Sequence, residues 1–222
     1  MTDSLGQGDA AVRLVRDERG LALVGDGMEL RGDFSRMLPR LRQGRLQQEL
    51  LVKAARIKGA EAPTAVDCTA GLGEDSLLLA AAGFTVTLFE RDQTIAALLA
   101  DALIRAAADP RLAEVVGRMT LVTGDSIAGL AALPEPPDVV YLDPMFPART
   151  KSAAVKKKFQ LLHHLEQPCE EEEALVAAAL AAHPRKVVIK RPAKGGLLAG
   201  MKPSYSVGGK AVRYDVLVPP RP

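Results

Sequence analysis

The chain has 222 residues, of which 48% are hydrophobic and 25% charged, a balance that suits one globular domain with at most a small appendage. The formal net charge is only +2, so the overall charge does not indicate a nucleic-acid binder. The two cysteines, Cys68 and Cys169, belong to no CxxC motif and no Cys/His cluster. This argues against a disulfide framework and predicts no metal site.

The start of the chain and its apolar runs bear on location. Residues 1–10 are polar and lack the apolar segment of a signal peptide. No run approaches the roughly 18 apolar residues that span a bilayer. Because free thiols fit a reducing compartment, we expect a soluble cytoplasmic protein without a membrane partner.

The amino-terminal part predicts a small β-containing region over residues 1–42. Residues 12–15 and 21–24 are strand-like and flank a turn sequence, which predicts a hairpin. A helix is predicted over 46–57. Four arginines precede it, and a solvated linker and a nucleic-acid contact are equally compatible with them. They are Arg36, Arg40, Arg42 and Arg45.

From residue 43 to 222 the pattern predicts one α/β domain. Expected strands alternate with helices, which is typical of a parallel sheet covered on both faces. The strands are 64–68, 84–89, 118–122, 138–142 and 186–190, and the helices are 74–82, 93–107 and 170–182. The acids at 170–173 suit a helix amino terminus better than a metal site. Residues 205–207 and 211–218 flank two glycines and predict a closing antiparallel hairpin. This arrangement resembles class I methyltransferases with a Rossmann-like sheet.

A glycine loop and a series of acids predict a cofactor site. The loop, residues 67–73, follows the first parallel strand, and Gly71 and Gly73 permit positive φ there. The dinucleotide fingerprint GxGxxG fails because Ser76 replaces its third glycine. One acid follows each of the first four parallel strands: Asp67, Glu90, Asp125 and Asp143. A lone acid at such a place is usually a helix cap. Four in order favour S-adenosylmethionine, with Glu90 accepting from the ribose hydroxyls and Asp125 from the adenine amino group.

The sequence after the fourth strand, Asp143-Pro144-Met145-Phe146-Pro147, resembles the motif with which amino-methyltransferases grip a planar NH2 group. The Asp143 carboxylate and the Pro144 carbonyl are expected to accept its two N–H bonds, and Phe146 to stack on the base. Positioning and electrostatics are then the main catalytic effects. A simple turn with a core phenylalanine is the alternative, which the upstream acids make less favourable.

The segment 148–158 carries five basic residues and no acid. Such a stretch is usually solvated surface, but its place beside the amine-gripping motif favours contact with RNA phosphates. These residues are Arg149, Lys151, Lys156, Lys157 and Lys158.

The glycine-loop region, the DPMFP motif with its KSAAVKKK run, and Lys190-Arg191-Pro192 together resemble the ribosomal RNA small-subunit methyltransferase J family over roughly residues 43–218. The resemblance implies methyl transfer from S-adenosylmethionine to the N2 of guanosine 1516 in 16S rRNA, free or in the small ribosomal subunit. It also implies cofactor contacts at Glu74, Asp75, Glu90, Arg91, Asp125, Ser126 and Asp143. The family usually has arginine where this chain has Glu74, which favours a backbone contact there.

Three other readings stay open. DNA adenine and protein glutamine methyltransferases use similar motifs, although Met145 and the basic segment favour the RNA enzyme. A non-catalytic RNA-binding module is disfavoured by the intact acids at the four strand ends. A nicotinamide dehydrogenase is disfavoured by the missing third glycine and by the closing hairpin.

Overall fold

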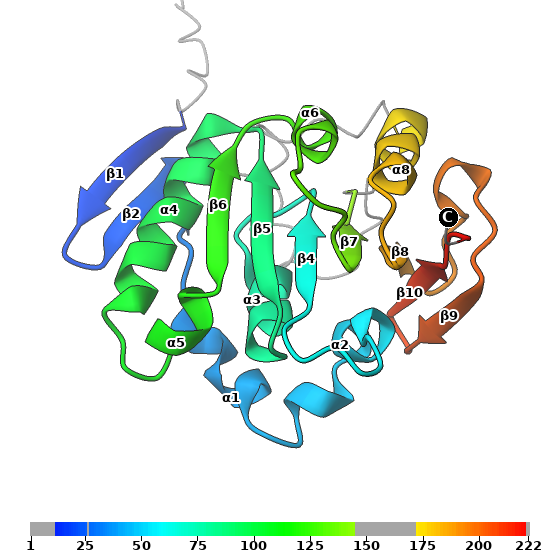
Figure 1. Cartoon of the computed structure of the whole chain (residues 1–222). Coiled ribbons are helices and arrows are strands. Elements are labelled where there is room, and N and C mark those ends of the chain that lie inside the picture. Colours follow the sequence, from blue (N-terminus) through cyan, green and yellow to red (C-terminus); the bar gives the residue numbers. More distant parts are fainter. Residues whose placement is uncertain (1–11, 26, 145–171, 221–222) are drawn as a thin grey trace, which may run out of the picture.

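The computed structural model describes residues 12–25, 27–144 and 172–220. Within these ranges the strands form a three-stranded amino-terminal sheet and a seven-stranded main sheet. Figure 1 shows the small sheet beside α4 (Gln93–Ala107) at one end of the molecule, and the hairpin β9–β10 (Tyr205–Gly208 and Val212–Leu217) at the other.

The amino-terminal sheet contains the predicted hairpin and one strand more. Its antiparallel strands are β1 (Arg13–Asp17), β2 (Gly20–Gly25) and β3 (Met28–Leu30), in that order. The third strand was not predicted because three residues are too few to show an alternating pattern. The predicted domain division at residue 42 stays a prediction.

The segment between the two sheets corrects one prediction. It contains η1 (Phe34–Met37), α1 (Leu38–Leu41), η2 (Leu46–Gln48) and α2 (Leu50–Ala55). The continuous helix predicted over 46–57 is wrong, because Glu49 has an extended backbone with ψ of 128°. Its carboxylate accepts two hydrogen bonds from the Arg40 guanidinium, each 2.8 Å long. This bidentate pair holds Glu49 where the helix is interrupted.

The main sheet confirms the predicted α/β class I methyltransferase fold. Its strand order is β6-β5-β4-β7-β8-β10-β9. The first five strands are parallel, β10 is antiparallel to β8, and β9 is antiparallel to β10. The five parallel strands are β4 (Thr64–Asp67), β5 (Thr85–Glu90), β6 (Met119–Thr123), β7 (Val139–Leu142) and β8 (Lys186–Pro192). After β4 the chain adds β5 and then β6 on one side of this strand, and it returns to the other side of β4 with β7. Ligands bind at such switch points in open α/β sheets.

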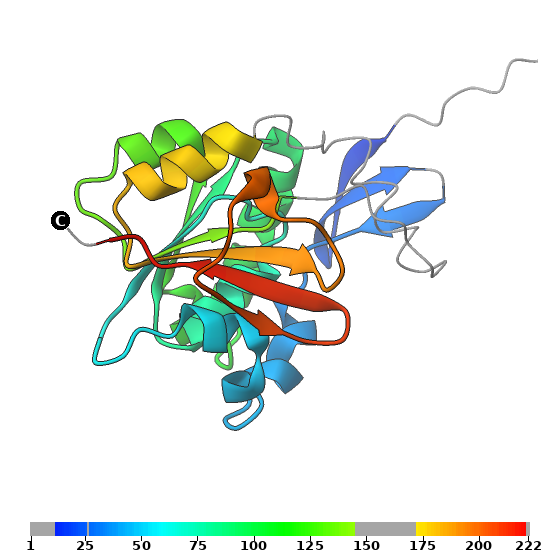
Figure 2. The ribbon, with the colours of Figure 1, turned by 90° about the vertical axis from the view of Figure 1, so that its right-hand side faces the viewer.

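Helices cover both faces of the main sheet, as predicted. Helices α6 (Ser126–Ala131) and α8 (Glu172–Ala181) cover one face, and α2 and α3 (Glu74–Ala81) cover the other (Figure 2). Their buried side chains belong to two separate core clusters. The side chains of strand β7 alternate between these two faces. Val139 and Tyr141 pack on the α2–α3 side, while Val140 and Leu142 pack on the α6–α8 side.

Five short helices were not predicted: η1 and α1 before the main sheet, and α5 (Ala113–Val116), α6 and η3 (Leu198–Gly200) within it. Gly129 lowers the helix propensity of α6. The fold nevertheless needs glycine there, because a Cβ would overlap the ring of Phe89.

A buried carboxylate ties the amino-terminal sheet to the main domain. Asp101 of α4 is 5% exposed and accepts hydrogen bonds from Arg16 (2.7 Å), Arg105 (2.7 Å) and the backbone N–H of Leu21 (3.0 Å). Gly20 has a φ of +103°, and a Cβ there would overlap Asp101 and Arg105. Close approach of the β1–β2 turn to α4 therefore requires glycine at position 20.

We expect Asp101→Asn to lower the free energy of unfolding by about 2–3 kcal/mol, since it weakens charge-assisted hydrogen bonds and leaves donors without partners. Burial raises the pKa of Asp101, but hydrogen bonds from Arg105, Leu21 and Arg16 outweigh burial and hold it below its ordinary value. The stabilisation is thus complete above about pH 4 and is lost as the pH falls through the pKa of the folded state. Urea unfolding of both proteins across this pH range measures the difference.

Asp109→Asn is the matched control. Asp109 pairs with Arg111, two residues away, in a solvent-screened ion pair, so its loss should cost little stability. Equal destabilisation by the two substitutions would contradict the special role of Asp101.

Candidate functional site

The carboxyl ends of β4, β5 and β7 meet at one edge of the main sheet, and the glycine loop lies between them. The backbone N–H of Cys68 donates to Tyr141 O at 3.0 Å, and that of Ala70 donates to Phe89 O at 3.1 Å. Neighbouring strands therefore fix the loop on both sides before the chain enters α3.

The two glycines of this loop are needed for different physical reasons. Gly71 and Gly73 both have positive φ, of +53° and +76°. A Cβ on Gly71 would meet nothing within 4 Å, so its backbone faces open space. A Cβ on Gly73 would lie 2.7 Å from Leu99 and 3.2 Å from Phe34. Gly73 is therefore required by packing, and Gly71 is the one whose backbone a ligand can approach.

Asp67, expected to contact a cofactor, is 1% exposed and turned into the protein. It accepts from the backbone N–H of Thr69 at 2.9 Å and from the Ser76 hydroxyl. Burial raises its pKa to about 7. Ser76, at the position of the missing third glycine, thus holds the loop acid against α3.

Glu90 at the end of β5 has the features of a ribose acceptor. Its two oxygens accept from the backbone N–H groups of Gly71 and Asp92, both at 2.9 Å. Burial raises the pKa of this carboxylate. Each carboxylate oxygen can accept a second hydrogen bond, so Glu90 can still bind two hydroxyl groups. A fixed, buried acid beside the open backbone of Gly71 fits the adenosine part of S-adenosylmethionine.

The remaining predicted cofactor residues follow β4, β5 and β6 at the same edge. Asp125 is exposed and caps α6 by accepting from the backbone N–H of Ile127 at 3.1 Å. Ser126 beside it is buried, while Glu74 and Arg91 are exposed. Capping uses one oxygen of Asp125, which leaves the other for an adenine amino group.

The last predicted acids, Asp75 and Asp143, meet through a lysine that the sequence did not single out for chemistry. Lys190 Nζ donates to Asp143 Oδ2 at 2.8 Å and to Asp75 Oδ2 at 2.7 Å. The Tyr141 hydroxyl donates to the same Asp75 oxygen at 2.6 Å. The backbone N–H of Asp143 donates to Thr69 Oγ1 at 2.7 Å, which joins the end of β7 to the glycine loop.

Burial and charge oppose each other in this cluster. Burial raises the pKa of Asp143, and the ammonium of Lys190 counteracts it. Burial lowers the pKa of Lys190, but the charges of Asp75 and Asp143 outweigh it, so the pKa is raised. Burial also raises the pKa of Tyr141 well above its ordinary range. Lys190 therefore stays protonated and Tyr141 stays a hydrogen-bond donor.

Pro144, next to Asp143, is described and buried. Six other predicted site residues lie outside the described part of the chain: Phe146, Arg149, Lys151, Lys156, Lys157 and Lys158.

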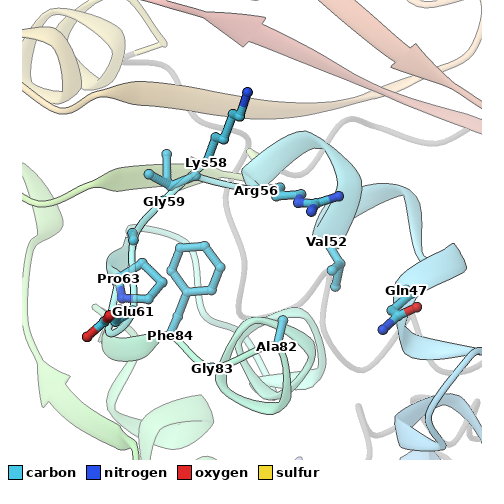
Figure 3. A pocket seen from close by; sticks show the side chains of 12 residues that line it. Gln47, Val52, Arg56, Lys58, Gly59, Glu61, Pro63, Ala82, Gly83 and Phe84 are labelled. Atoms are coloured by element: carbon cyan, nitrogen blue, oxygen red, sulfur yellow. The ribbon is translucent and has the colours of Figure 1, made fainter.

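A cavity of about 480 Å³ lies away from this site, at the opposite edge of the sheet. It is lined by the loop between α2 and β4 and by the turn before β5, including Lys58, Gly83 and Phe84 (Figure 3). These residues precede the strands, whereas the predicted site follows them. None of the predicted site residues lines the cavity.

Residues 12–25, 27–144 and 172–220 contain no group of three or more His, Cys, Asp or Glu side chains placed to hold a metal ion. No helix in these ranges is long and apolar enough to cross a membrane.

Comparison with known proteins identifies the family. A family model described as "Putative SAM-dependent methyltransferase" matches residues 7–219. Ribosomal RNA small subunit methyltransferase J of Thioalkalivibrio sulfidiphilus is 46% identical over 213 residues, covering 92% of this chain and 84% of the relative. The protein of the same name from Neisseria meningitidis is 40% identical over 206 residues, covering 91% and 82%.

A solved structure agrees with this relationship. The SAM-dependent methyltransferase NGO1261 from Neisseria gonorrhoeae is 33% identical, with a TM-score of 0.78, and the match covers 96% of this chain and 85% of that one. The chain therefore belongs to the ribosomal RNA small subunit methyltransferase J family, and its cofactor is S-adenosylmethionine.

Proposed function

We propose that this chain methylates the exocyclic N2 of one guanosine in small-subunit ribosomal RNA, and that it works in the cytoplasm. The resemblance of its motifs implies guanosine 1516 of 16S rRNA as the target. Its relatives are named for small-subunit ribosomal RNA. The observation that carries the proposal is the place of Asp143-Pro144 at the end of β7, bonded through Thr69 to the glycine loop of β4.

The geometry of this edge supports the proposed roles of the cofactor residues. Glu90 binds the ribose hydroxyls, the backbone of Gly71 lies against the ligand, and Asp125 with Ser126 receives the adenine. Glu74, Asp75 and Arg91 border the same space, while Asp67 and Gly73 act by holding the loop. S-adenosylmethionine supplies a methyl group activated by its positive sulfur.

Asp143 and Pro144 have the task of orienting the amine. The lone pair of an exocyclic amino group is delocalised into the base, so the nitrogen is a poor nucleophile. Oδ2 of Asp143 is occupied by Lys190, whereas Oδ1 has no hydrogen-bond partner among the described residues. Oδ1 and the Pro144 carbonyl accept the two N–H bonds, and Phe146 stacks on the base. A charged acceptor at the amine also stabilises the positive charge that develops during attack.

The RNA is held by cations around the same edge. Arg149, Lys151, Lys156, Lys157 and Lys158 are proposed to contact phosphates. Three exposed lysines of the carboxyl-terminal segment, Lys194, Lys202 and Lys210, support such a surface.

Two lysines of that carboxyl-terminal segment border the proposed site. Lys194 and Lys210 are exposed on the loops that leave β8 and enter β10. A hydrogen bond of 2.9 Å from Ala193 N to Ala211 O joins the two loops. Since β8 is the neighbour of β7, these lysines lie at the edge that holds Asp143.

Glu90→Ala should weaken binding of S-adenosylmethionine by about 1.5–3 kcal/mol, or roughly ten- to a hundredfold in Kd, because a charge-assisted acceptor is lost. Glu90→Gln should have a smaller effect, since the amide oxygen still accepts a hydrogen bond. Calorimetry measures both. Glu114→Ala, at an exposed acid of α5, serves as the control, and an unchanged Kd in Glu90→Ala would refute the ribose assignment.

Asp143→Ala should lower single-turnover methyl transfer to 16S rRNA at saturating cofactor by on the order of a hundredfold or more. Asp143→Asn should fall between it and the wild type, because an amide oxygen accepts one hydrogen bond but lacks the charge. Nucleoside analysis of the product should give N2-methylguanosine. Near-wild-type transfer by folded Asp143→Ala would contradict the grip on the amine.

The same assay separates the proposal from its rivals. Methyl transfer to adenine in DNA or to glutamine in protein, but not to RNA, would identify a related amino-methyltransferase. RNA binding with no methyl transfer to any of the three substrates would identify a non-catalytic module.

Replacing Lys156, Lys157 and Lys158 with Ala, or Lys194 and Lys210 with Ala, should weaken RNA binding. Each lost phosphate contact should lower the slope of log K against log salt by about 0.7–0.9. Affinity for S-adenosylmethionine should stay the same. Lys58→Ala, in the cavity at the opposite edge, is the control and should leave the slope unchanged. A wild-type slope in both multiple variants would mean that these lysines are only solvated surface.

A further inference from the structure

Lys190 links two elements that approach the proposed amine site from different sides. It lies on β8 next to β7, on the α2–α3 side of the sheet, and its side chain is 25% exposed. Its ammonium bonds Asp143 at the end of β7 and Asp75 in the first turn of α3. The Tyr141 hydroxyl fixes the same Asp75 oxygen, so the lysine has two anchored partners.

This arrangement constrains the Asp143 carboxylate. Its backbone N–H is held by Thr69 and its Oδ2 by Lys190. Rotation about the carboxylate bond would break the contact with Lys190. Oδ1 is consequently the oxygen left for a substrate amine, and its direction is set before the substrate binds. Preorganisation of this kind is an effective way to lower a barrier.

The charges around Asp143 make a cation necessary. Asp75 from α3 and Asp67 from β4 are the nearby acids, while Tyr141 from β7 and Tyr214 from β10 face the cluster. Arg40, after η1, acts on Asp75 and Tyr214 from farther out. Lys190 is the cation of the described residues that bonds Asp143 directly.

We propose that Lys190 is a positioning residue for methyl transfer: its ammonium keeps the Asp143 carboxylate charged and oriented, with Oδ1 presented to the amine. This inference rests on the proposed function. It assigns to β8 a role in the reaction that the sequence motif around Asp143 does not contain. A lysine that only stabilises the fold would not change how the rate depends on pH.

The test is the pH profile of single-turnover methyl transfer, at saturating cofactor and RNA. The rate falls on acidification when Asp143 takes up a proton, because a neutral carboxyl no longer stabilises the developing charge. Lys190→Met should move this acid limb to higher pH by about one unit or more, the scale of losing one adjacent opposite charge. Lys190→Arg should keep the limb near its wild-type position.

Two further variants sharpen the test. Lys186→Met changes a lysine four residues earlier on the same strand, whose ammonium bonds Ala54 O and Arg56 O at the opposite edge. It should leave the acid limb in place. Asp75→Asn removes the second acid that shares Lys190, so it should move the limb to lower pH. This opposite shift tests the account even where Lys190→Met does not fold.

The outcomes separate this inference from the proposed function. Absence of methyl transfer to rRNA by the wild type would refute the function itself. With an active wild type, an unshifted acid limb in folded Lys190→Met would overturn the role of Lys190 alone. A uniform loss of rate at every pH would overturn it as well, since that is the mark of a structural lysine.

Discussion

Desolvated carboxylates at the carboxyl edge of the main sheet are the constraint on which the site depends. Burying a carboxylate costs free energy unless hydrogen-bond donors reach it, and each acid here accepts from different donors. Asp67 takes Ser76 and a loop amide, and Glu90 takes the amides of Gly71 and Asp92. Asp143 takes a lysine. The amide donors of Thr69, Gly71 and Asp92 belong to the glycine loop and to the turn after β5, so satisfying Asp67 and Glu90 also builds the cofactor loop.

The amino-terminal region supports this edge from outside. The Asp101 network fixes the small sheet on α4, the helix that follows Glu90. Phe34, at the start of η1, lies where a side chain on Gly73 would be. The region thus packs against the glycine loop as well as against α4. Substitutions in the amino-terminal region are therefore expected to change cofactor binding through the glycine loop.

The sequence predicted the main sheet well because buried parallel strands are continuous apolar runs bounded by turns. It also indicated that the four acids lie at one edge of the sheet, since each acid follows the end of a parallel strand. The role of Asp67 could not be read in this way, because its bond to Ser76 depends on the angle between the loop and α3. Gly73 similarly matched the pattern of a ligand loop but is required by the packing of Leu99 and Phe34.

Contacts between distant segments were beyond the sequence. Lys190 and Asp75 are 115 residues apart, and only the strand order β4-β7-β8 brings them together. The lysine at the end of an apolar strand was nevertheless a usable signal, because it follows the same rule as the acids. The failed helix over 46–57 has a comparable cause: the pair of Arg40 with Glu49 overrides a sequence of good helix formers.

Methylation of a guanosine amino group of small-subunit ribosomal RNA, which we propose for this edge of the sheet, leaves a mark that can be mapped in 16S rRNA from cells that have or lack the gene. We expect one N2-methylguanosine to disappear without the gene and to return when the wild-type gene, but not the Asp143→Ala variant, is supplied. An identical set of N2-methylguanosines in both cell types would contradict this proposal.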